Sequence, residues 1–152
     1  MRYSETRWGR VFVLRLEHGD LLPDTLEGFA RDQGIEAALV YFLGGADESS
    51  TIAVGPEDGT TPKPRPVMRN LAGVSEAVGL GTLFPNEEGQ PKLHLHASFG
   101  RGGETVTGCT REGVRVWHIG EAVLCEILDT GMLRKVDAKT GFELLEKEGD
   151  RE

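Results

Sequence analysis

The hydrophobic residues of this chain gather in short runs that are separated by glycine, proline and polar residues. Residues 10–17 (RVFVLRLE) and residues 35–43 (IEAALVYFL) are two such runs, and both contain β-branched and aromatic side chains. Apolar runs of this length and composition are typical of buried β-strands. The pattern therefore predicts a strand at each of these two positions.

One helix is predicted between these two strands. Apolar residues recur there at helical spacing, at Leu22, Leu26, Phe29 and Ala30. Pro23 suits the first turn of a helix, and Gly34 suits the residue that follows the last turn. We therefore expect a helix over residues 22–33, and a connection of this length allows the two flanking strands to be parallel.

The rest of the chain is expected to be built of strands. They are predicted at residues 51–54, 66–71, 75–84, 92–99, 105–110, 114–119, 122–128 and 139–145. Gly79 and Gly81 lie inside one of them, which indicates a bulge or the close approach of another backbone segment. Neither an internal repeat nor a change of composition divides the sequence, so we expect one compact α/β domain that is mostly strand.

The strand at residues 92–99 has the clearest alternation of apolar and polar side chains. Its apolar positions are Leu93, Leu95, Ala97 and Phe99, and its polar positions are His94, His96 and Ser98. Because successive side chains of a strand leave opposite faces, His94 and His96 leave the same face and could bind one metal ion. The alternative is that these polar side chains simply cover the solvent-exposed face of a half-buried strand.

A metal ion held by two histidines needs a third ligand. The candidates in this sequence are His118, Cys109 and a carboxylate such as Glu121. The two cysteines, Cys109 and Cys125, do not form a CxxC pair, and a lone cysteine is more often a small buried side chain than a nucleophile.

Composition and charge narrow the classes of function. The 152 residues include 21 glycines, and 25 acidic against 17 basic residues give a net charge of −8 at pH 7. A negative domain repels DNA at long range, so DNA binding would need a local basic patch. The sequence around Lys63, Arg65 and Arg69 is the one short basic stretch, and a solvated loop is the better explanation of it.

Several common enzyme and membrane signatures do not occur in the sequence. It contains neither a GxxxxGK[ST] phosphate loop nor a GxSxG elbow, which makes an NTPase or an α/β-hydrolase a poor fit. The first ten residues lack the apolar stretch of a signal peptide, and no apolar window is long enough to span a membrane. We therefore expect a cytoplasmic protein without a membrane partner.

Two stretches of the sequence resemble a known family. Residues 10–45 (RVFVLRLEHGDLLPDTLEGFARDQGIEAALVYFLGG) are similar to the opening of the PPC (plants and prokaryotes conserved) domain, and residues 91–108 (PKLHLHASFGRGGETVTG) are similar to its HLH strand and hairpin. The likeness extends in order over residues 10–145, which we take as the domain, and residues 146–152 are taken as an acidic C-terminal tail. The resemblance implies a central mixed, mostly antiparallel sheet with the principal helix packed on it, and a homotrimer.

The resemblance also implies a metal site. Some members are similar in having two histidines on the HLH strand and a third histidine in a Gly-Gly-His segment that follows. This chain has His94 and His96, but the third position is Cys109 in Gly108-Cys109-Thr110. Zinc or another divalent metal would therefore need Cys109 or His118 as its third ligand.

The expected function follows from these observations. We expect a homotrimeric binding or regulatory module with a metal or small-ligand site at the HxH strand. Plant members carry an AT-hook that reads DNA, but this sequence has no RGRP-type hook, so association with DNA is implied only by the family and is disfavoured by the charge. The alternative is a metal-dependent enzyme of unknown reaction, in which Glu104 or Glu121 would act as the general base. Under the expected binding function, no catalytic residue is assigned.

Overall fold

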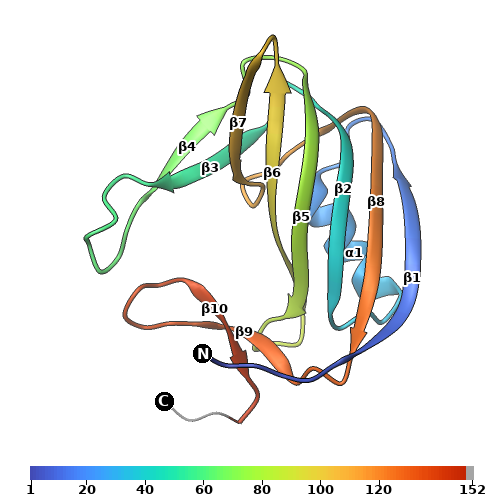
Figure 1. Ribbon diagram of the computed structural model, residues 1–152, viewed down its shortest axis with the longest axis vertical. Coiled ribbons are helices and arrows are strands. Elements are labelled where there is room, and N and C mark those ends of the chain that lie inside the picture. The colour runs from blue at the N-terminus through green and yellow to red at the C-terminus, as the bar shows by residue number, and fades with distance from the viewer. Residues whose placement is uncertain (150–152) are drawn as a thin grey trace.

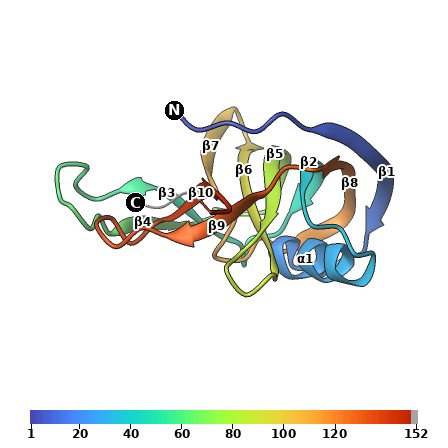
Figure 2. The same ribbon diagram turned by 90° about the horizontal axis from the view of Figure 1, so that it is seen from below.

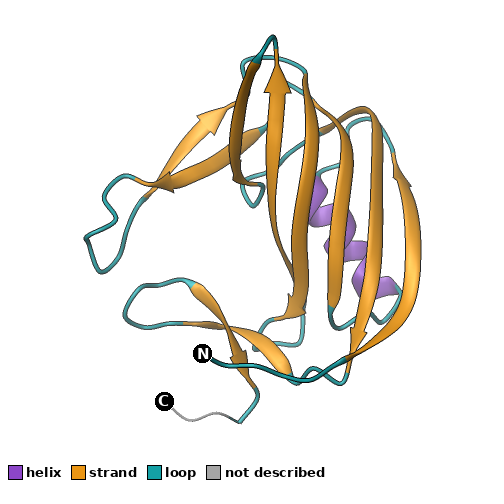
Figure 3. Ribbon diagram, viewed as in Figure 1, coloured by secondary structure: helices purple, strands orange, loops and turns teal. Residues whose placement is uncertain are grey.

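The computed structural model describes residues 1–149, and most of them lie in strands (Figures 1 and 3). The elements are β1 (Arg7–Leu16), α1 (Leu22–Asp32), β2 (Ala38–Ala46), β3 (Thr51–Pro56), β4 (Pro66–Asn70), β5 (Ser75–Pro85), β6 (Pro91–Arg101), β7 (Glu104–Cys109), β8 (Val116–Leu128), β9 (Met132–Val136) and β10 (Glu143–Lys147). This arrangement confirms the predicted single domain with one principal helix.

One sheet of eight strands forms the body of the molecule. Its strand order is β1-β8-β2-β5-β6-β7-β3-β4, and all of its described strand pairings are antiparallel. Both β1 and β2 are antiparallel to β8, so they run in the same direction but are separated by β8. A helix about 10 Å wide covers two strand spacings of about 4.8 Å, so α1 can connect two strands that have a third between them.

The hydrophobic core lies between α1 and one face of this sheet (Figure 2). The helix buries Leu22, Leu26 and Ala30, whose spacing confirms the predicted apolar stripe. On β6 the alternation is also confirmed: Leu95 and Phe99 are buried against the helix side, whereas His94 and His96 are exposed on the other. The strand pattern therefore places both histidines on the face that α1 does not cover.

We call this second face the open face of the sheet. It exposes the large apolar side chains Val11, Val13, Tyr41, Leu43, Val78 and Leu80. The register joins them to the histidine strand, because His96 lies opposite Leu80, Leu80 opposite Tyr41, Tyr41 opposite Val123 and Val123 opposite Val13. The open face thus carries a continuous apolar band that ends at His96.

The chain after β8 forms a separate two-stranded hairpin of β9 and β10. The strand β9 was not predicted, because its buried Arg134 occupies a position where alternation requires an apolar side chain. The acidic tail predicted from residue 146 overlaps β10, which extends to Lys147, and residues 150–152 lie outside the described residues. Within residues 1–149 no helix is long and apolar enough to cross a membrane.

Candidate metal centre

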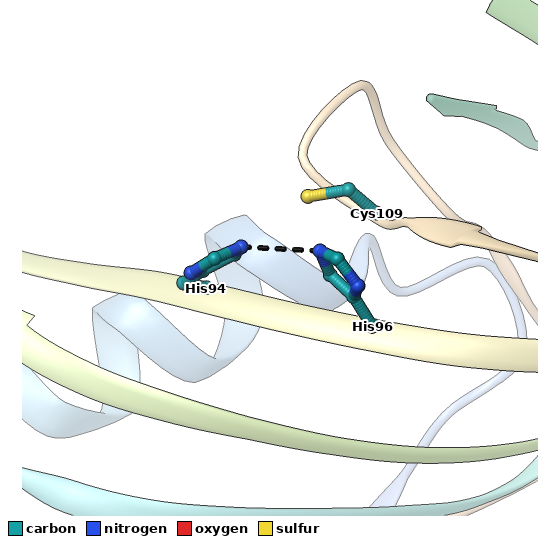
Figure 4. Close-up of side chains that lie close together, drawn as sticks. All are labelled: His94, His96 and Cys109. Carbon is teal, nitrogen blue, oxygen red and sulfur yellow. Dashed lines mark hydrogen bonds between the residues drawn. The ribbon is translucent and has the colours of Figure 1, made fainter. Parts of the chain in front are cut away.

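His94 and His96 converge on the open face of β6 (Figure 4). Their Nε2 atoms are 3.1 Å apart, and their rings meet edge to face with centroids 4.9 Å apart. They lie two residues apart on a regular strand, which explains why both rings leave on the same side. The predicted convergence of the two imidazoles is confirmed by the structure.

Cys109 brings a sulfur atom to the same place from the end of β7. Cys109 lies opposite His96 in the β6–β7 pairing, so its side chain is on the same face as the histidine. It is 4% exposed, whereas both histidines are exposed. The ligand atoms of His94, His96 and Cys109 all lie within 4.8 Å of one another, and these residues form the one group of this kind among the described residues.

The preceding Gly108 explains how β3 can pack so closely beside this site. A Cβ atom at Gly108 would lie 2.7 Å from the carbonyl oxygen of Ala53 on β3, which is closer than real Cβ atoms come. Ala53 is in turn the residue that pairs with Cys109. Glycine at this position therefore lets β3 approach and hold the end of β7 where the sulfur faces the histidines.

The three side chains fit a divalent metal of the zinc type. Two nitrogens bound to a tetrahedral zinc ion at about 2.0–2.1 Å lie roughly 3.3 Å apart, and thiolate and imidazole are ligands that zinc prefers. The Nε2 atoms of His94 and His96 are 3.1 Å apart, close to this separation. The same distance also suits an N–H···N hydrogen bond between the two imidazoles when no metal is bound.

Two arginines determine the electrostatics around these ligands. Arg111 donates from its Nε to the Sγ of Cys109 at 3.2 Å, which places a positive charge beside that sulfur. Partial burial lowers the pKa of His94 below its ordinary value, and the positive charges of Arg134 and Arg111 lower it further. A lowered pKa keeps His94 neutral near pH 7, which is the form that binds a metal.

The other candidate residues lie apart from this group. On β8, His118 donates its backbone N–H to Nδ1 of His18 at 3.2 Å, and the two rings stack with centroids 4.6 Å apart. Glu121 lies opposite Leu43 on β2, and Glu104 lies at the hairpin end of β7. Of the third ligands that the sequence offered, the structure brings only Cys109 to the histidine pair.

Sequence reasoning missed two residues at this site, Arg111 and Arg134. Arg111 follows Cys109 by two positions, and this spacing was a usable signal because short turns bring such neighbours together. Arg134 comes from β9, and no local pattern places it near residues that precede it by about 40 positions. Two surface hollows lie elsewhere, one along the β9–β10 hairpin and one along the N-terminal segment.

The fold and the site define a class of protein: a small antiparallel sheet with one covering helix and a His-His-Cys group on its open face. The chain belongs to the family of the Plants and Prokaryotes Conserved (PCC) domain, also written PPC, whose profile matches residues 3–128. This confirms the family to which residues 10–45 and 91–108 were compared. A comparison with curated proteins gave no match.

Solved structures share this fold over nearly the whole chain. A metal-containing protein from Archaeoglobus fulgidus is 24% identical, with a TM-score of 0.83, and the match covers 97% of this chain and 100% of that protein. A PPC protein from Pyrococcus horikoshii is 23% identical, with a TM-score of 0.83 and coverage of 97% and 98%. A protein from Ralstonia eutropha, provisionally described as DNA-binding, is 22% identical, with a TM-score of 0.69 and coverage of 88% and 89%.

Proposed function

We propose that this protein is a binding or regulatory module that holds one divalent metal ion, zinc, between His94, His96 and Cys109. The observation that carries the proposal is the convergence of two imidazole nitrogens and one buried sulfur within 4.8 Å. The metal found in the Archaeoglobus relative adds support from the same fold. Three protein ligands leave one position of a tetrahedral metal open, and a metal supplies a charge that polarises whatever binds there.

The residues around the site favour binding over catalysis. A metal-dependent hydrolase needs a base beside the open position. Glu104, one candidate for that role, lies at the opposite end of β7 from Cys109. Glu121, the other, lies on β8, which β2 and β5 separate from the histidine strand. The free thiols of Cys109 and Cys125 are consistent with the reducing environment of the cytosol.

We also propose that the module is a homotrimer. The open face exposes Val13 and Leu80 at 80% and 55%, and a soluble protein rarely leaves such a band uncovered. Because the band ends at His96, a second copy seated on it would lie beside the metal site. Cyclic symmetry closes such an assembly with identical contacts on every subunit.

DNA association is the second candidate function. The description of the Ralstonia relative supports it, and so does the exposed basic stretch formed by Lys63, Arg65 and Arg69. The net charge of −8 opposes it, so we expect no electrophoretic shift of duplex DNA by micromolar protein at moderate salt. A shift that Lys63→Glu/Arg65→Glu removes would establish the DNA function instead.

Substitution of the proposed ligands tests the metal site. We expect wild-type protein to bind zinc with one ion per chain in equilibrium dialysis, and His94→Ala or Cys109→Ala to weaken it at least tenfold. Cys109→His should retain binding, because a third imidazole can replace the thiolate. The matched control is His118→Ala, which removes a histidine outside the group and should leave zinc affinity unchanged. Equal affinity in the Cys109→Ala and wild-type proteins would contradict the proposed site.

A further inference from the structure

Arg134 is a buried cation without a carboxylate partner among residues 1–149. It is 6% exposed, and no described acidic oxygen lies within ion-pair distance of it. Its Nε donates to the carbonyl of Lys92 at 3.3 Å, and its Nη2 donates to the carbonyl and hydroxyl of Thr82 at 3.2 and 3.0 Å. All three acceptors are neutral, and the carboxylates of Glu143 and Glu27 act on Arg134 only beyond ion-pair distance. A buried guanidinium that no carboxylate contacts directly is unfavourable.

The contacts of Arg134 place it beside the proposed metal ligands. Thr82 lies directly opposite His94 in the β5–β6 pairing, so the Thr82 hydroxyl and the imidazole are neighbours on the open face. Arg134 donates to that hydroxyl, which brings its guanidinium to the same face.

The charges around the site do not balance when a divalent metal is bound. The metal contributes two positive charges, and the Cys109 thiolate removes only one. Arg111 reaches the Sγ of Cys109 and Arg134 reaches the Thr82 hydroxyl opposite His94, so each adds one positive charge beside the site. The nearby carboxylates are Glu143 and Glu27, and neither forms an ion pair with Arg134. Glu27 pairs with Lys92 at 3.5 Å and accepts the backbone N–H of Leu93 at 2.9 Å. Glu143 offsets at most one positive charge, so the site keeps a positive excess.

We propose that the ligand that completes this centre is an oxyanion, the carboxylate or phosphate group of a small molecule. It would occupy the open position of the metal and pair with Arg134 and Arg111, because guanidinium groups bind these two oxyanions through paired, charge-assisted hydrogen bonds. The exposure of both histidines gives such a molecule access from the open face. This proposal rests on the proposed metal site and names the class of ligand that the site takes.

The test uses cobalt(II), a spectroscopic substitute for zinc, bound to the full-length protein. Acetate and inorganic phosphate are titrated separately at constant ionic strength, with perchlorate as the weakly coordinating control, and the visible absorption of the cobalt is followed. We expect a saturable spectral change with acetate or phosphate but not with perchlorate. The half-saturation concentration should rise at least tenfold in Arg134→Gln and severalfold in Arg111→Gln.

Two controls keep the result interpretable. Arg111 is exposed, so Arg111→Gln is expected to fold even if substitution of the buried Arg134 disrupts β9. The exposed Arg69 on β4 provides the matched control Arg69→Gln, which should leave the titration unchanged.

The possible failures are distinguishable. Cobalt binding with no anion-dependent change, or with unchanged half-saturation in Arg111→Gln and Arg134→Gln, would overturn the oxyanion proposal and leave the metal site standing. Failure of the wild-type protein to bind cobalt would overturn both proposals. If phosphate acts and acetate does not, the ligand is a phosphorylated molecule; the reverse result identifies a carboxylate.

Discussion

Glu126 on β8 is a buried carboxylate whose charge is compensated by Arg10 on β1. The guanidinium donates from Nη2 to Oε1 at 2.6 Å and from Nε to Oε2 at 2.8 Å, and the backbone N–H of Arg10 also donates to Oε2 at 2.9 Å. These bonds from Arg10 hold the pKa of Glu126 at about 2, well below its ordinary value of 4.5. The pair therefore joins the edge strand to the sheet through a charge that must stay ionised.

The lowered pKa of Glu126 predicts how stability depends on pH. A carboxylate with a depressed pKa stabilises the fold fully above pH 4.5, and this contribution is lost as the pH falls towards 2. We expect the ion pair to contribute about 2 kcal/mol to the free energy of unfolding, since half-exposed Arg10 is partly screened by solvent. Urea unfolding at pH 7, 4.5 and 2.5 measures this contribution. The loss between pH 4.5 and 2.5 should be smaller in Glu126→Gln than in the exposed control Glu57→Gln, and identical losses would contradict this role.

The sequence could predict some residues of the site but not others. Alternation along β6 was sufficient to predict that His94 and His96 share a face, because period-two geometry is local. The choice between Cys109 and His118 was not local, since it depends on which strand pairs with β6. Arg134 could not be predicted, because it reaches the site from a hairpin that the hydrophobic pattern did not reveal.

At the scale of elements, Gly81 allows β5 to pack closely against β6, the strand that carries both histidines. A Cβ atom at Gly81 on β5 would lie 2.6 Å from the carbonyl oxygen of His94 and 2.7 Å from the Cα of Leu95. These are backbone atoms of β6, so they cannot rotate away from the added group. Gly81 therefore allows β5 to lie beside the strand that carries both histidines, as its position inside a predicted strand had indicated.

Substitution of Gly81 tests this close approach. We expect Gly81→Ala to destabilise the fold by about 2 kcal/mol or more, because β5 and β6 must separate. It should also weaken zinc binding, since the displaced backbone carries His94. Gly100→Ala on β6 is the matched control, because the nearest atom to its added Cβ would be 3.8 Å away. Thermal denaturation that shows equal stability for the two variants would argue against the role of Gly81.

The order of the elements was harder to predict than their positions. The helix and the strands up to β8 lie near their predicted residues, because each depends on a local hydrophobic pattern. The strand β9 was not predicted, and the strand predicted at 139–145 is found later, at Glu143–Lys147. The insertion of β8 between β1 and β2 depends on contacts between residues far apart in the sequence, such as Val13 with Val123, which are 110 positions apart. The predicted strands at 114–119 and 122–128 form the single strand β8, because the chain continues extended through the buried Gly120.

At the scale of the whole molecule, the open face predicts self-association. We expect sedimentation equilibrium to give about 50 kDa, three times the chain mass of 16.6 kDa. Leu80→Asp places a charge in the exposed apolar band and should give the monomer mass, without loss of the core that packs on α1. Leu144→Asp on β10 is the control, because that leucine is exposed outside the band. A monomeric wild-type protein would contradict the trimer and leave the metal site to be judged separately.

Residues of β6 and β7 are proposed to coordinate one metal ion. The most direct measurement is X-ray absorption fine structure at the zinc edge of the metal-loaded protein. We predict one sulfur at about 2.3 Å, two imidazole nitrogens at about 2.0–2.1 Å and one further light atom from the open position. Loss of the sulfur signal in Cys109→His, with nitrogen in its place, would identify the sulfur as that of Cys109. A wild-type zinc shell without sulfur would contradict the His94, His96 and Cys109 centre.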